Sequence, residues 1–138
     1  MCERHHRNMN LNTKLHLWRY LPIVAMAVII LVLSLLPSKS FPVVHWALAD
    51  KVVHLVLYMG LMWAVLWLLS TSHWQLWLIG CVCSIAYGGL IEVLQALTSS
   101  RSASWGDVCA DIVGVLIGLL TYLFFRKIMN GCNNEHSV

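Results

Sequence analysis

The sequence predicts an all-α, polytopic membrane protein: a bundle of four transmembrane helices with the N and C termini in the cytoplasm. The first observation is composition, because the 138 residues are 59% hydrophobic and only 11% charged, whereas soluble domains carry about 25% charged residues. The second is that the chain contains four long apolar runs, each close to the length that crosses the hydrocarbon core of a bilayer. The lipid bilayer is therefore the first expected partner.

The expected elements follow these apolar runs. Residues 1–20 are expected to form a flexible, basic cytoplasmic tail, and residues 126–138 a disordered one. Between them lies the membrane domain, 21–125, with spans at about 21–36, 51–69, 76–97 and 105–125. Pro37 ends the first run, and residues 38–50 are expected to form a loop or a segment on the membrane surface. A serine-rich loop, 98–104, joins the last two spans.

The basic residues predict the orientation of the bundle. With four spans both termini lie on one side, and that side collects Arg4, Arg7, Lys14, Arg19, Arg126 and Lys127. The opposite side collects Lys39, Lys51 and Arg101. The excess of basic residues is cytoplasmic in membrane proteins, so both termini are expected in the cytoplasm.

Two other classes of protein are excluded. The basic residues are scattered near the ends of the apolar runs and form no single patch, which argues against a nucleic-acid partner. The five cysteines lack the paired spacing of a disulfide framework or a zinc motif.

Most polar side chains of the membrane domain are expected at its outer face. Four carboxylates fall there: Asp50 opens the second span, Glu92 is near the end of the third, and Asp107 and Asp111 begin the fourth. A carboxylate within an apolar segment is costly, so it requires a partner, water or a functional role. Helical spacing then aligns three groups, which are Asp50, His54 and Tyr58; Glu92 and Gln95; and Asp107, Asp111, Gly114 and Gly118.

The glycines indicate which way the acidic face of the fourth span points. Gly114 and Gly118 form a G-x-x-x-G pattern, which permits another helix backbone to approach closely. Because Asp107 and Asp111 lie on the same face, we expect both carboxylates to point into the bundle, toward the second or third span.

These motifs together resemble the VanZ-like family of small bacterial membrane proteins. The resemblance rests on D-K-x-x-H-x-x-x-Y from Asp50 to Tyr58, E-x-x-Q from Glu92 to Gln95, then Arg101, Asp107 and the glycine pair, and covers roughly residues 33–122. One departure is Asp111, where the family pattern has Asn. The family is named for a member linked to teicoplanin resistance. The resemblance implies a multi-pass protein of the bacterial inner membrane concerned with the cell envelope.

The leading functional hypothesis is a protein that binds or modifies an envelope molecule, such as a lipid-linked phosphate or a peptidoglycan precursor. Arg101 and Lys51 are the expected anion-binding cations, because guanidinium and ammonium groups suit phosphate. The remaining expected ligand-binding residues are Asp50, Tyr58, Gln95, Ser104 and Asp111. The sequence identifies no cofactor.

Two alternatives remain open. The first is a membrane-embedded enzyme in which Glu92, His54 and Asp107 act as general acid and base; a metal site at His54, Glu92, Asp107 and Asp111 is a weaker option. The second is a structural protein, assembling with itself or with another membrane protein, in which the polar residues hold helices together. In that case Glu92 forms a salt bridge to Arg101 or Lys51, and Asp107 and Ser104 serve the N-terminus of the last helix.

Overall fold

The computed structural model describes residues 2–36, 46–70, 73–98 and 104–135, with side chains in 18–36, 48–70, 73–98 and 104–131. Within these ranges every element of regular secondary structure is a helix, in the order α1 (Cys2–Leu35), α2 (Trp46–Leu69), α3 (Trp74–Ala96) and α4 (Trp105–Glu135). Each helix contains a segment long and apolar enough to cross a membrane. The predicted all-α class with four spans is confirmed.

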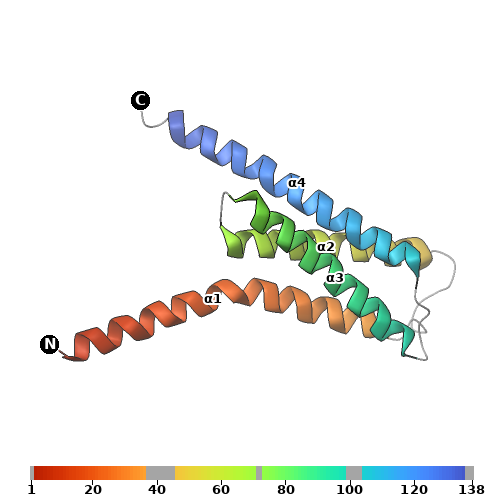
Figure 1. The fold of residues 1–138 in the computed structure, drawn as a ribbon, viewed down its shortest axis with the longest axis horizontal. Helices are drawn as coiled ribbons and strands as arrows, with labels where there is room; N and C mark the ends of the chain where they lie inside the picture. Colours follow the sequence, from red (N-terminus) through yellow and green to blue (C-terminus); the bar gives the residue numbers. More distant parts are fainter. Residues whose placement is uncertain (1, 37–45, 71–72, 99–103, 136–138) are drawn as a thin grey trace.

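The outer two helices are longer than their predicted spans. α1 begins at Cys2 and α4 continues to Glu135, so the expectations of a flexible tail before residue 21 and a disordered one after residue 125 are wrong for these parts. Hydropathy detects only the portion of a helix that lies in lipid, whereas arginine, lysine and leucine continue a helix into water at little cost. Pro22 lies inside α1, and the missing N–H and the ring of a proline account for the bend of this helix in Figure 1.

The second and third helices also start earlier than expected. α2 begins at Trp46, so the end of the predicted loop 38–50 belongs to the helix, and α3 begins at Trp74. α2 ends where Ser70 adopts a left-handed φ of 40°. The Ser70 hydroxyl donates to the carbonyl of Trp67, 2.7 Å away, which satisfies one of the free carbonyls at the helix C-terminus.

The helices alternate in direction, which gives the bundle two distinct ends. Both chain termini lie at the end of the bundle where α2 ends and α3 begins, which we call the terminal end (Figure 1). The start of α2, the end of α3 and the start of α4 meet at the opposite end, called the cluster end. α2 contacts all three other helices. This arrangement agrees with the expectation that both termini lie on one side of the bundle, and the cytoplasmic placement of the termini stays a prediction.

α2 and α4 pack closely because two glycines of α4 face the α2 backbone. A Cβ atom on Gly114 would lie 2.4 Å from the carbonyl oxygen of Leu55, and one on Gly118 would lie 2.7 Å from that of Met59. Neither position has space for a side chain unless the helices separate. The G-x-x-x-G face of α4 is therefore in direct contact with α2, and the register between these helices is set by the two glycine contacts.

Polar contacts between helices add to this packing, and apolar side chains cover the outside. The Trp63 indole donates to the Thr121 hydroxyl at 2.9 Å, and the Tyr87 hydroxyl donates to the Ala27 carbonyl at 2.7 Å. Exposed valines and leucines lie on the outward faces, with Val28 and Val56 each about half exposed. In lipid such a surface carries no penalty, because acyl chains solvate it.

Candidate functional site

The cluster end holds an unusual concentration of buried polar side chains. His54, Glu92, Gln95, Asp107 and Asp111 are each at most 9% exposed. Together with Asp50, Lys51 and Ser104, which are partly buried, we call them the polar cluster. Three helices supply it, because α2 starts, α3 ends and α4 starts at this place, and helical spacing turns each polar group inward.

Two pairs link α2 to α4 within the cluster. The Lys51 ammonium lies 3.0 Å from the Asp107 carboxylate, and His54 Nδ1 lies 2.8 Å from Asp111 Oδ1. Lys51 was expected to serve as an anion binder, and in the structure it contacts Asp107. Gly106 makes room for it, since a Cβ there would lie 2.5 Å from the Lys51 side chain.

The His54–Asp111 pair is the most enclosed polar contact of the cluster. Both side chains are less than 5% exposed, and Asp111 Oδ2 occupies space that a Cβ on Gly88 of α3 would need, 2.6 Å away. A carboxylate on one imidazole nitrogen fixes the ring orientation and leaves Nε2 as the second functional atom. An Asn at this position could accept the same hydrogen bond without the charge.

Glu92 joins the end of α3 to the start of α4. The backbone N–H of Ser104 donates to Glu92 Oε1, and the Ser104 hydroxyl accepts from the backbone N–H of Gly106 at 3.2 Å. Ser104 thus has the N-cap role anticipated for it, with Asp107 in the first turn of α4. The Glu92–Lys51 salt bridge, which was expected if the cluster only held helices together, is not found among the described residues. Arg101 lies outside the described residues.

Gln95 and Tyr58 complete the inner part of the site. The Gln95 amide donates to the Ser34 carbonyl of α1 at 2.9 Å, so it acts as a contact between helices. Tyr58 is completely buried and its ring is nearly parallel to His54, with centroids 6.3 Å apart. Among the described residues, the hydroxyls of Tyr58 and Ser84 are buried without a hydrogen-bond partner.

Sequence reasoning missed three contributors to this region. Ser34 supplies a carbonyl from α1, Gly88 makes room for Asp111, and Ser84 is buried on α3. A signal existed for two of them, because Ser84, Gly88 and Glu92 are four residues apart and therefore share one face of α3. Nothing in the sequence indicated where α1 docks, so the role of Ser34 could not be anticipated.

A narrow recess between α1 and α2 leads to the polar cluster. Its lining combines apolar and polar side chains, which are Leu33, Ser34, Asp50, Val53, His54 and Leu57. Leu33 and Val53 are 41% and 44% exposed, so the recess opens on the side of the bundle that faces lipid. Asp50 and His54 are among its lining residues, and His54 itself is only 3% exposed.

Three side chains of the cluster have the types and spacing of metal ligands. Asp50, His54 and Asp107 each offer a ligand atom, all within 4.8 Å of one another. Imidazole with carboxylates suits Zn²⁺ or Mn²⁺, and the Asp111–His54 contact resembles the carboxylate that orients a metal-bound histidine. This set differs from the predicted option, because Glu92 and Asp111 contact Ser104 and His54. The same three groups can also bind a cationic or hydroxyl-bearing ligand directly.

Comparison with known proteins assigns the chain at the level of a family. No curated protein and no solved structure matches it. The model of the VanZ/LLP1 family matches residues 3–126, nearly the whole chain. The resemblance seen in the D-K-x-x-H, E-x-x-Q and G-x-x-x-G motifs is confirmed, and with four membrane-spanning helices this chain belongs to the VanZ/LLP1 family as a multi-pass membrane protein.

Proposed function

We propose that this protein binds the polar head of a lipid-linked cell-envelope molecule at the polar cluster, in the outer leaflet of the bacterial inner membrane. The observation that supports the proposal most is the recess between α1 and α2. It has an apolar wall of Leu33, Val53 and Leu57 and a polar floor of Asp50 and His54. A ligand with a lipid tail and a polar head requires both surfaces at the depth where the bilayer meets water.

The charge of the cluster favours a head group rich in hydrogen-bond donors. Its described side chains include four carboxylates, those of Asp50, Glu92, Asp107 and Asp111, against the single ammonium of Lys51. Carboxylates accept hydrogen bonds, so they complement hydroxyl, amide and ammonium groups. The sugar and peptide parts of a peptidoglycan precursor carry such donors, and a phosphate carries none. A phosphate in the same ligand would be bound by Lys51, whose side chain is 38% exposed, and by Arg101.

Admission of a head group requires the recess to widen, and α1 is the helix that can move at least cost. Only 11% of the α1 span is buried, compared with 33% of the α2 span. Outward movement of α1 would break the Gln95–Ser34 hydrogen bond. The Gln95 amide would then be available to the ligand. The same movement would leave the glycine-mediated α2–α4 contact in place.

A second candidate, acid–base chemistry on the same ligand, is favoured by the His54–Asp111 pair. With Nδ1 hydrogen-bonded to a carboxylate, His54 can take a proton at Nε2, and Asp111 stabilises the resulting imidazolium. Glu92 and Asp107 are the other candidate acids. The third hypothesis, a structural role for these contacts, is compatible with both the binding and the acid–base proposals, because each contact also joins two helices.

The proposal can be tested with purified protein in lipid nanodiscs. Three probes are compared: a lipid-linked disaccharide-pentapeptide, a polyprenyl phosphate and a zwitterionic phospholipid. His54→Asn is the test variant, because the Asn amide can replace Nδ1 toward Asp111 while Nε2 is lost. His73→Asn is the matched control at the terminal end, where the side chain is exposed.

We expect the disaccharide-pentapeptide lipid to bind most tightly, measured by native mass spectrometry. His54→Asn should weaken its binding about 10-fold, as loss of one hydrogen bond to a ligand predicts, and His73→Asn should leave it unchanged. A change in the mass of the bound lipid would support the acid–base candidate. Equal affinity for all three probes, or for both histidine variants, would reject the proposed site.

A further inference from the structure

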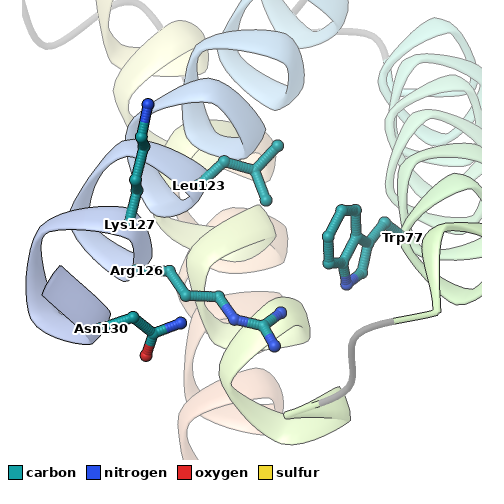
Figure 2. Close-up of a pocket in the computed structure, with 5 residues that line it drawn as sticks. All are labelled: Trp77, Leu123, Arg126, Lys127 and Asn130. Atoms are coloured by element: carbon teal, nitrogen blue, oxygen red, sulfur yellow. The ribbon is translucent and has the colours of Figure 1, made fainter. Parts of the chain in front are cut away.

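A second recess lies at the terminal end, far from the polar cluster. It is lined by Trp77 of α3 and by Leu123, Arg126, Lys127 and Asn130 of α4 (Figure 2). The lining thus combines two cations, a carboxamide, an indole and one aliphatic side chain. We call it the basic groove. The proposed function makes no use of these residues.

Arg126 is held in a defined position within the basic groove. Its guanidinium carbon lies 5.7 Å from the centroid of the Trp77 ring, and Figure 2 shows the side chain extended from α4 toward Trp77. A guanidinium over an indole face is stabilised by the ring quadrupole. Lys127 is the next residue of α4, and its ammonium extends away from Arg126 in the same view.

The distribution of charge makes this end of the molecule attractive to anions. Among the described side chains the carboxylates are Asp50, Glu92, Asp107 and Asp111, and all four belong to the cluster end. Arg126 and Lys127 lie near the opposite end of the bundle. The two ends therefore differ in sign, and the basic groove complements a negatively charged group.

Position along α4 indicates what kind of anion the groove meets. The apolar span of α4 reaches Gly131, so Arg126 and Lys127 lie where a transmembrane helix leaves the hydrocarbon. Tryptophan and basic side chains concentrate at this level, beside lipid phosphates. Leu123 lies one turn deeper than Lys127 on the same face, at the level of the first acyl-chain carbons.

We propose that the basic groove binds an anionic phospholipid. Its phosphodiester accepts hydrogen bonds from Arg126 and from the Asn130 amide, Lys127 neutralises its charge, and one acyl chain passes along Leu123 and Trp77. If the termini are cytoplasmic, this is an inner-leaflet lipid. The site is distinct in ligand and in membrane face from the polar cluster, so either can fail without the other.

The test is a comparison of phosphatidylglycerol with phosphatidylcholine in native mass spectrometry of the full chain. The double variant Arg126→Gln, Lys127→Gln removes both cations, and Arg19→Gln is the control. Arg19 is also basic, and it donates to the Leu68 carbonyl at the end of α2 without lining the groove. We expect wild type to prefer phosphatidylglycerol and the double variant to bind it about 30-fold more weakly, as two interfacial cations predict. Arg19→Gln should keep the preference.

A second measurement places the lipid beside Trp77 and needs only a mild substitution. Phosphatidylglycerol with brominated acyl chains should quench tryptophan fluorescence more than brominated phosphatidylcholine at the same mole fraction. The difference should disappear in Trp77→Phe, which retains an aromatic lining. Equal quenching by both lipids in wild type, or an unchanged difference in Trp77→Phe, would overturn the proposal. So would a loss of preference in Arg19→Gln as large as in the double variant.

Discussion

Replacing Gly114 by alanine should separate α2 from α4 and thereby disrupt the polar cluster, whose nearest α4 member, Asp111, lies one turn away. The new Cβ would lie 2.4 Å from the Leu55 carbonyl oxygen, whereas carbon and carbonyl oxygen normally approach to about 3.3 Å. The obstacle is the backbone of Leu55, so no side-chain rotation can relieve it. α4 must move away from α2 by about 1 Å, the difference between these two distances.

A movement of that size acts directly on the two pairs that join these helices. Lys51–Asp107 and His54–Asp111, at 3.0 and 2.8 Å, would lengthen beyond hydrogen-bonding distance. Overpacking a helix interface costs about 1–3 kcal/mol, and each interhelical hydrogen bond in a membrane protein contributes about 0.6 kcal/mol. The expected destabilisation is therefore about 2–4 kcal/mol relative to an alanine substitution without a clash.

Gly89→Ala provides that reference, because a Cβ on Gly89 has nothing within 4 Å. It carries the same gain in helix propensity within a membrane span, so the propensity term cancels in the comparison. Gly118→Ala, with 2.7 Å to the Met59 carbonyl, should fall between the two. Reversible unfolding in mixed micelles, followed by tryptophan fluorescence, gives the order. Equal stability of Gly114→Ala and Gly89→Ala would refute the glycine-mediated contact between α2 and α4.

Three further predictions follow from single contacts. Asp111→Ala should destabilise the bundle by about 1–3 kcal/mol because it leaves His54 Nδ1 buried without its partner, while Asp111→Asn should cost far less; similar losses in both would contradict a hydrogen-bond role. Trp63→Phe should cost roughly 0.6 kcal/mol in the same unfolding assay by removing the bond to Thr121, and Thr121→Val in that background should add little. In a cysteine-free background, Ser102→Cys should react with an impermeant thiol reagent on intact spheroplasts, and labelling only after lysis would reverse the predicted orientation.

Sequence patterns were sufficient for the architecture and for the convergence of the polar residues. Alternating spans oblige the start of α2, the end of α3 and the start of α4 to meet, and helical spacing turns His54, Glu92 and Asp107 to the same interior. Both inferences depend only on the length of apolar runs and the period of a helix. Neither requires knowledge of how one helix is shifted along another.

The choice of partners within the cluster could not be predicted, because it depends on that shift. Contact of Gly114 with Leu55 sets the register of α4 on α2, and this register pairs Lys51 with Asp107 and His54 with Asp111. A displacement of one turn would have offered different partners from the same sequence. The helical extension of α1 and α4 beyond their predicted spans was missed for another reason, since hydropathy reports lipid contact rather than helix formation.

The most direct test of the proposed site is a structure determined in nanodiscs that contain the lipid-linked disaccharide-pentapeptide. We expect density for its head group between α1 and α2, in contact with Asp50 and His54, and the Ser34–Gln95 hydrogen bond broken by outward movement of α1. Head-group density elsewhere on the protein, with the recess unchanged and the Ser34–Gln95 contact intact, would contradict a binding role for the polar cluster.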